Sequence, residues 1–552
     1  MNKILIIIFL CFVLSPVLGQ EKQGNERGEV KDTEFIIRKD RVLTLPKKNK
    51  NFEKVPALPQ PEGLDKFDYE VRDFFFQLDP SPSKMKPYQK RFESSTGETY
   101  HSFVKLGYGN YQSPLAELHL NNLESDYLNY GVYLKHQGFY EGPIDKKNSA
   151  EDHTNIRIAA NYFMEYFEAF GKIGYDRDKY HFYGYTPNLE INPEDIGQIF
   201  HTLFGRGGIR NIDRMDPFNY EISLGARIFN DDYSAREHQV DLNANAYYQI
   251  SDNFKGGLEG QAFLTSPSDE TYSDLNRNYL KASPYLEFKN EKFKLLAGAN
   301  IILENDEIPG KSSSAHLFPR LKANYQLEEE FGLYASFEGD VQRNTYYSFV
   351  QENPYLGPSE KLLNTIQDFK ATGGIKGNIN DAFTYKFAIS YGQYDQMHFY
   401  GNHENDSTRF QVVYDSTTNV LNYKGGIGYE FDKIYQLNAE VNYYHYSLES
   451  LTGAWHRPKW TLDVRNQFTP DARWLIQANA KVMGGINAIN FQSDRTSTLN
   501  PIIDLQVKAD YKLTDQFSLF VEGNNLLHQR NQRFWNYPSR GIQGIGGLTF
   551  KF

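Results

Sequence analysis

The sequence of 552 residues contains a single cysteine, Cys11. It lies inside the apolar run Ile4–Leu14 and not at a lipobox, which argues against a lipid anchor. Lys3 precedes this run and Gly19 follows it, so residues 1–19 are predicted to be a signal peptide. The run is shorter than the ~20 residues that a membrane helix needs. The mature protein is therefore expected to lack thiols, which excludes disulfides, thiolate catalysis and cysteine metal sites.

Long hydrophobic runs are absent after the signal peptide, and the mean hydropathy is −0.62. Alone, this would indicate a soluble secreted protein. However, the chain has only 4 Trp but 40 Tyr and 40 Phe. A membrane β-barrel places such half-polar rings at both lipid–water interfaces, and its half-apolar strands escape hydropathy scans. The net charge of −11 makes nucleic acid an improbable partner.

Catalytic motifs are absent as well. The sequence contains no HExxH, G-x-S-x-G or phosphate-binding G-x-x-x-x-G-K-S/T motif. His403-Glu404 has no second histidine at helical spacing. The acidic stretch Glu304–Glu307 could bind calcium, but it lacks glycine-punctuated ligand spacing, which favours a solvated surface loop. We predict no enzyme, no cofactor and no metal site.

An alternation of apolar and polar residues runs through the chain after residue 100. Between Ile503 and Leu513 every second residue is apolar or aromatic, and the residues between them are polar. This period of two predicts β-strands. Charged rows cannot face a dry core, so they are predicted to face a lumen. The predicted lumen-facing residues are Asp504, Gln506, Lys508, Asp510, Asp463 and Arg465.

Connection lengths separate a membrane barrel from a soluble sandwich or propeller, which also alternate. From residue 236 onward, short turns such as Asp252-Asn253 alternate with long loops, including 344–366 and 394–418. This segregation is typical of outer-membrane barrels. The predicted fold is all-β: a transmembrane antiparallel up-and-down barrel of about 22 strands over residues 99–552, with short periplasmic turns and long extracellular loops. Asp195–Arg210 is predicted to be either a strand or a short helix.

Residues 20–98 differ from the rest of the chain. They are rich in proline and contain short apolar bursts. The composition predicts an extended periplasmic or lumen-filling segment. The apolar bursts predict a lumen plug or a partner contact through Phe35, Ile37, Phe74 and Phe76.

The C-terminal region VKADYKLTDQFSLFVEGNNLLHQR, followed by a closing aromatic strand, resembles the last strands of TonB-dependent outer-membrane receptors. Glu352–Pro358 (ENPYLGP) resembles the NP-x-L-x-P element before a mid-barrel strand of that family. The richness in Tyr and Asn is similar to barrels of Bacteroidota. A terminal aromatic also resembles the tag read by the barrel-insertion machinery, which predicts an insertion signal at Phe550 and Phe552.

The chain departs from this family at its N-terminal side. The barrel pattern begins near residue 100, which leaves no room for the family's globular plug, and Glu34–Pro46 matches a TonB-binding box only loosely. The resemblance therefore implies a plugless barrel subunit of a larger outer-membrane complex, for protein assembly or secretion, with its lumen filled by the N-terminal segment and loops. The alternatives are a passive channel for small solutes and a TonB-linked importer with a missing or borrowed plug.

The same resemblance sets the expected surroundings. We expect the outer membrane of a Gram-negative bacterium, with both termini periplasmic. The expected partners are outer-membrane lipid and lipopolysaccharide, the barrel-insertion machinery, and other outer-membrane or periplasmic subunits.

Overall fold

The computed structural model describes residues 102–552, apart from 123, 124, 126, 187, 188, 213–215, 271, 272, 274, 309, 310, 312, 329, 358–360 and 381. The predicted signal peptide and the 20–98 segment, with Phe35, Ile37, Phe74 and Phe76, lie outside the described residues. Within the described part, none of the helices has the length and apolar character needed to cross a membrane.

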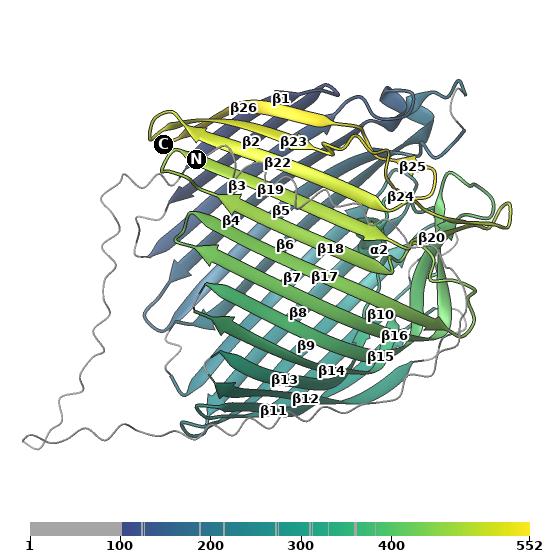
Figure 1. Ribbon diagram of the computed structural model, residues 1–552. Coiled ribbons are helices and arrows are strands. Elements are labelled where there is room, and N and C mark those ends of the chain that lie inside the picture. Colours follow the sequence, from purple (N-terminus) through teal and green to yellow (C-terminus); the bar gives the residue numbers. More distant parts are fainter. Residues whose placement is uncertain are drawn as a thin grey trace, which may run out of the picture. The chain divides into compact units, whose positions relative to one another are not determined.

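Antiparallel strands form one closed barrel (Figure 1). The sheet holds 24 strands, of which β20 and β21 are an attached hairpin, so 22 strands make the wall. The last strand pairs with the first, from Phe103↔Lys551 to Gly109↔Ile545. The predicted barrel is confirmed. Its strands are β1 (Phe103–Gly109), β2 (Ser113–Asn122), β3 (Leu128–Phe139), β4 (Glu151–Phe163), β5 (Phe167–His181), β6 (Gly197–Asn211), β7 (Phe218–Asn230), β8 (Arg236–Gln249), β9 (Phe254–Ser268), β10 (Arg277–Lys289), β11 (Phe293–Asp306), β12 (Ser314–Glu328), β13 (Phe331–Gln342), β14 (Thr365–Ile379), β15 (Phe383–Asn402), β16 (Phe410–Phe431), β17 (Tyr435–Leu448), β18 (Trp460–Phe468), β19 (Trp474–Gly484), β22 (Ile502–Lys512), β23 (Phe517–Asn524) and β26 (Gln543–Lys551).

The two ends of the barrel differ in their connections. At one end, here the turn end, neighbouring strands are joined by short turns such as 290–292 and 432–434. At the other, the loop end, connections such as 343–364 and 525–542 are long. The loop-end connections contain the remaining elements: η1 (Lys147–Ser149), η2 (Pro193–Ile196), α2 (Tyr346–Glu352), β20 (Asn487–Asn490), β21 (Arg495–Thr498), β24 (Gln532–Phe534) and β25 (Tyr537–Pro538).

Two sequence expectations are decided by the strand bounds. The predicted long loop 394–418 is wrong, because β15 continues to Asn402 and β16 begins at Phe410, and only 403–409 connect them. Alternation fades in these strand ends because both faces are covered; Phe399, Tyr400 and Phe410 are all fully buried. The uncertain stretch near Asp195–Arg210 is strand β6, which follows the short 3-10 turn η2.

Ion pairs identify the inner face of the wall. The Lys281 ammonium on β10 binds Asp340 on β13 at 2.7 Å, and Arg320 on β12 binds Glu259 on β9 at 2.9 Å. Each pair skips two strands, which are spaced about 4.8 Å apart, so the side chains can meet only across the concave face. Large apolar side chains, including Leu286 and Leu317, are exposed on the opposite, convex face. Polar rows therefore face inward and apolar rows outward.

Exposed aromatic side chains gather on the outer wall near the turn end. On β17, Tyr435 and Tyr443 share the outward row and lie eight residues apart, roughly 26 Å along the strand. That span is close to the ~25 Å apolar band of membrane barrels, whose edges carry aromatic girdles. The girdle accounts for part of the Tyr and Phe content. Its exposed members at the turn end include Tyr127, Tyr162, Tyr166, Phe218, Tyr248, Phe254, Phe431, Phe468, Trp474, Phe517 and Phe552.

Candidate functional site: a capped lumen

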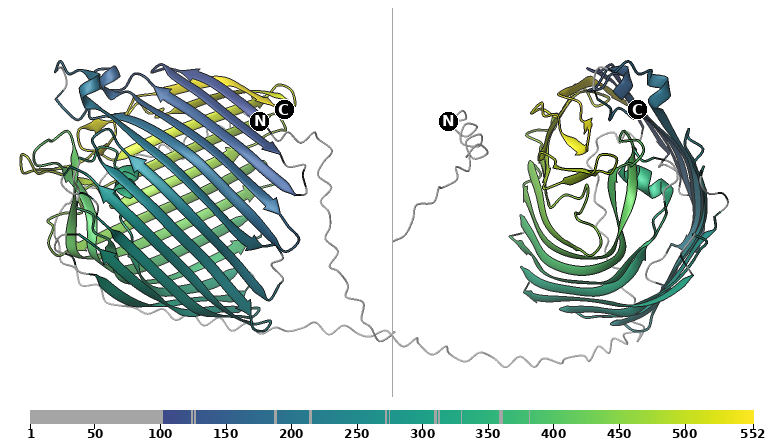
Figure 2. Two further views of the ribbon diagram at one scale, coloured as in Figure 1. Left: turned by 180° about the vertical axis from the view of Figure 1, so that it is seen from behind. Right: turned by 90° about the vertical axis from the view of Figure 1, so that its right-hand side faces the viewer.

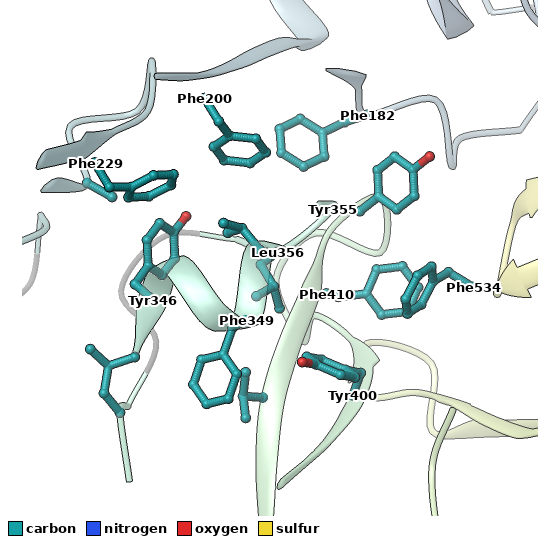
Figure 3. Close-up of a cluster of buried hydrophobic side chains, with 14 of the residues drawn as sticks. Phe182, Phe200, Phe229, Tyr346, Phe349, Tyr355, Leu356, Tyr400, Phe410 and Phe534 are labelled. Atoms are coloured by element: carbon teal, nitrogen blue, oxygen red, sulfur yellow. The ribbon is translucent and has the colours of Figure 1, made fainter. Parts of the chain in front are cut away.

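The loops at the loop end fold across the mouth of the barrel. Figure 2 (right), which looks into this end, shows α2 and the C-terminal loop strands lying within the ring of the wall. They enclose one apolar cluster, which we term the cap (Figure 3). The buried residues of the cap are Phe182, Tyr183, Phe200, Phe229, Ala235, Ile308, Tyr346, Phe349, Val350, Tyr355, Leu356, Leu362, Leu363, Tyr400, Phe410, Val412, Phe534 and Tyr537.

Helix α2 is fixed at its N-terminus by polar contacts. Thr345 is the N-cap, and its hydroxyl accepts a hydrogen bond from the Ser348 backbone N–H at 3.1 Å while the Ser348 hydroxyl accepts one from Thr345 N–H. The fully buried Glu237 carboxylate on β8 accepts a bond from Tyr346 N–H at 2.9 Å. A carboxylate is favourable at this end of a helix. The loop is therefore fastened to the inner wall at a defined point.

The Asn-Pro element ends α2 and leads the chain into the cap. Asn353 is its C-cap, and Pro354 follows. The chain then runs beside β16, with Phe410 N–H donating to Tyr355 C=O and Gly357 N–H donating to Phe410 C=O, both at 2.8 Å. This backbone pairing places the side chains of Tyr355 and Leu356 in the cluster. Residues Asn353–Gly357 of the ENPYLGP motif therefore contribute two buried side chains to the cap.

Aromatic rings from separate loops interlock in the cap. The Tyr355 and Tyr537 rings stack with centroids 3.7 Å apart, and Phe410 and Phe534 meet edge to face at 5.4 Å. Burying each such ring contributes about 1.5–3 kcal/mol. Because these four rings come from three parts of the chain, the 343–364 connection, the tip of β16 and the 525–542 connection, opening one loop exposes its neighbours.

A charged contact fastens the other end of α2. Glu352 accepts a hydrogen bond from the Tyr400 hydroxyl and pairs with the Arg457 guanidinium, both at 2.9 Å. Burial alone would raise the pKa of Glu352, but the hydrogen bond from His398 and the charge of Arg457 outweigh it and hold the pKa at about 2. The carboxylate is therefore charged at neutral pH, and it ties α2 to β15 and to the 449–459 loop.

The predicted lumen-facing residues lie on the inner rows of β18 and β22. On β22, Gln506 donates to Asp504 at 2.9 Å, and Lys508 pairs with Asp510 at 3.2 Å. On β18, Arg465 pairs with Asp463 at 2.9 Å, and both line a hollow of about 710 Å³ that reaches across β12–β18 toward the turn end. A hollow shared by so many strands lies on the concave face. The structure places all six together on one wall; their role stays a prediction.

The predicted insertion signal lies at the turn end. The Phe550 ring is 4.8 Å from Phe517 and 5.6 Å from Phe552, and about half of Phe552 is exposed. Both belong to the outward row of the closing strand and its extension. This geometry fits the girdle, and an additional role as a signal stays a prediction.

The prediction of a solvated loop at Glu304–Glu307 is wrong. Glu304 and Asp306 are buried on β11, and both bind the Lys311 ammonium, at 2.7 and 2.9 Å. The Lys311 ammonium therefore neutralises the carboxylates that could otherwise have bound calcium. Among the described residues, no group of three His, Cys, Asp or Glu side chains is arranged to hold a metal ion.

Sequence reasoning missed the residues that build the cap. Glu237, Glu352 and Arg457 are ordinary charged positions in the sequence, and their partners lie far away along the chain. The one available signal is the ENPYLGP motif, whose proline and aromatic residues mark a structured loop.

Neither the protein-family models nor the curated protein sequences contain a match to the chain. Solved structures do match. The FrpB iron transporter from Neisseria meningitidis is 11% identical, with a TM-score of 0.64 over 83% of this chain and 82% of that one. The pyoverdine outer membrane receptor FpvA from Pseudomonas aeruginosa is 12% identical, with a TM-score of 0.62 over 83% and 79%. The copper transporter OprC is 13% identical, with a TM-score of 0.62 over 82% and 81%.

At such low identity the similarity establishes the fold and nothing finer. The protein shares the 22-strand outer-membrane barrel of TonB-dependent receptors, which confirms at the level of fold the resemblance of its C-terminal strands. The barrel fold supports an outer-membrane location, and the matched proteins themselves are an iron transporter, a pyoverdine receptor and a copper transporter.

Proposed function

We propose that the protein is a non-enzymatic outer-membrane barrel that is closed at rest, and that it serves as a barrel subunit of a larger outer-membrane assembly. One observation carries the first part: the cap buries rings from three loop-end connections and four strand tips in the mouth of the barrel. A passive channel for small solutes needs an open path, and a dry aromatic cluster at the mouth opposes one. A closed barrel leaves its outer wall and its two ends as working surfaces.

Conductance tests the closed state. The purified full chain in planar bilayers is expected to show little conductance. Replacing residues 345–363 by a short Gly-Ser linker removes α2 and the Asn-Pro element, and conductance should rise. Replacing residues 269–276 by the same linker changes a loop that contributes no cap residue, and conductance should stay low. High conductance of the unaltered protein would contradict closure.

Isolation from native membranes tests the subunit role. Cross-linking before solubilisation should recover the barrel with outer-membrane or periplasmic proteins in fixed stoichiometry. Recovery as a lone polypeptide, with or without cross-linking, would overturn the subunit role while leaving closure intact. The predicted lack of a plug, the lumen-filling role of 20–98, the Bacteroidota type and the periplasmic termini belong to this proposal.

A gated importer is the second candidate, because the fold is that of iron and copper transporters and of a pyoverdine receptor. In that case the cap would open only with an energy source or a ligand. Uptake that depends on the TonB system in cells, combined with low conductance of the isolated protein, would favour the importer over the subunit.

A further inference from the structure

A small recess opens on the inner wall beside Tyr347 of α2. Its volume is about 260 Å³, and it is bounded by strands β4 to β8 and by Tyr347 of α2. Its charged lining is predominantly basic. The charged residues that line it are Arg157, Lys172, Arg206, Arg227, Asp176 and Asp241.

The positive charge of the recess exceeds what its carboxylates neutralise. Three ion pairs account for three of the four cations: Arg157 with Asp176 at 2.6 Å, Arg206 with Asp241, and Arg227 with Glu237 at 3.0 Å. Lys172 has no carboxylate within 4 Å among the described residues.

A second unpaired cation lies beside the recess. Arg343 donates to the Gln239 side chain, which lines the recess, at 2.8 Å and lies over the Phe263 ring at 4.0 Å. Burial and the nearby Arg227 lower the pKa of Arg343 to about 10, so this guanidinium is still charged at neutral pH. Lys172 and Arg343 together leave an excess of two positive charges.

The strand register makes this excess unfavourable for the empty protein. Lys172 on β5 is directly opposite Arg206 on β6. Like charges that face each other across neighbouring strands destabilise a sheet. Elsewhere on the inner wall, Lys281 and Lys322 have carboxylate partners, whereas Lys386 has none among the described residues. An unfavourable arrangement without local compensation is typical of a functional site.

The recess also offers directed hydrogen-bond donors. Arginine presents a planar fork that matches carboxylate and phosphate oxygens. Gly225 lies between Arg206 and Asp241, and a Cβ atom there would be 2.8 Å from the Asp241 carboxylate, so the glycine leaves room for this pair. The Arg227 guanidinium lies over the Tyr347 ring, 3.9 Å from its centroid, and this contact fixes one hydrogen-bond donor on the α2 side of the recess.

We propose that this recess binds a small anion carrying two or more negative charges, a polycarboxylate or a phosphate compound. Its volume suits such a molecule and is too small for a folded partner. Residues 20–98 carry 16 Lys and Arg against 15 Asp and Glu, so their charge gives no reason to make them the occupant. The site goes beyond the proposed function, because an anion can bind to the wall of either a closed subunit or a gated importer.

Isothermal titration of the detergent-purified full chain with citrate and with pyrophosphate tests the proposal. Saturable binding of at least one anion is expected, and the preferred one assigns the site to carboxylates or to phosphates. Lys172→Gln should weaken binding about tenfold, since a hydrogen bond to a charged group is worth that much. Lys172 is exposed in the lumen and makes no ion pair, so this change should not disturb folding. Lys322→Gln, which alters an ion-paired lumen lysine seven strands away, should leave affinity unchanged.

Two further measurements complete the test. The double variant Arg206→Gln/Asp241→Asn removes one donor without leaving an unpaired carboxylate, and it should weaken binding at least as much as Lys172→Gln. Repeating the titration on the 345–363 linker variant prevents a closed cap from hiding the recess. Absence of saturable binding in both the full chain and the linker variant overturns the proposal. Equal weakening by Lys172→Gln and Lys322→Gln would also overturn it, because it would indicate unspecific charge attraction.

Discussion

A single buried histidine joins three parts of the cap region. The His456 Nδ1–H donates to Tyr400 C=O at 2.8 Å, and its Nε2 accepts from Trp535 N–H at 3.3 Å. These contacts use both nitrogens of the neutral ring. Burial lowers the pKa of His456 to about 3, against a usual value near 6.5. Protonation would add a buried charge and remove the acceptor.

We therefore expect the cap to weaken in acid. The unfolded histidine takes up a proton near pH 6.5 and the folded one only near pH 3, so the stability is complete above pH 6.5 and falls as the pH decreases between these values. At pH 5 the loss is about 2 kcal/mol. The fluorescence of Trp455 and Trp535 should report it. In His456→Gln an amide that can donate and accept hydrogen bonds replaces the imidazole, and it does not titrate. A fluorescence transition between pH 6.5 and pH 3 that persists in this variant would refute the assignment of the transition to His456.

Phe552 provides a second test at the residue scale. Its ring lies in the aromatic girdle at the turn end and is about half exposed. Phe552→Asp should lower the amount of barrel in the outer membrane, because a charge replaces an outward aromatic at the closing strand. Lys551→Asp changes the neighbouring residue on the inward row and should have little effect. Fractionation followed by immunoblotting measures both. Equal levels of the two variants would exclude a special role for the terminal ring.

At the scale of elements, the closing seam is tested by two glycines of β26. A Cβ atom on Gly547 would lie 2.0 Å from the Leu106 carbonyl oxygen, whereas one on Gly544 would meet nothing within 4 Å. Gly547→Val should therefore push β1 and β26 apart, and Gly544→Val should be tolerated. The fraction of protein that migrates as a compact, heat-modifiable band in gels reports closure. A normal compact band for Gly547→Val would show that the seam can shift at little cost.

Strands and turns are predictable here because their cause is local. Apolar and polar residues alternate wherever one face meets lipid and the other meets the lumen, as on β22 and β17. The turn at 432–434 likewise lies where Asp432 and Lys433 interrupt the alternation, and both residues adopt positive φ there. Such signals need only a few neighbouring residues, so the strand number follows from the sequence.

The cap could not be predicted for the opposite reason. Tyr355 meets Tyr537, and Glu352 meets Arg457, across separations of about a hundred residues or more that no local pattern encodes. The projecting ends of β15 and β16 lose their alternation because the cap covers one face and loops cover the other. Without alternation, the sequence pattern predicts a loop at these positions.

At the scale of the whole molecule, the two faces of the single sheet are adapted to different surroundings, lipid outside and a polar lumen inside. The outer wall gains from apolar burial in lipid, while the inner wall is held by ion pairs that cross the concave face. The chain from residue 102 onward carries 42 Lys and Arg against 55 Asp and Glu, yet the recess beside Tyr347 is locally basic. The local charge of a lumen surface therefore differs from the charge of the whole barrel.

The different surroundings of the two faces lead to a test of the barrel as a membrane protein. Val441 lies on the outward row of β17 and is about half exposed, and the next residue, Asn442, faces the lumen and donates to Glu440. Val441→Arg is expected to destabilise the folded barrel by about 2–4 kcal/mol if the residue lies near the bilayer midplane. Asn442→Arg adds the same side chain to the watery, ion-paired interior and should cost little. Urea unfolding of both variants in lipid vesicles measures the difference. If the two substitutions cost the same, or if Asn442→Arg costs more, the outer wall of the barrel does not face lipid.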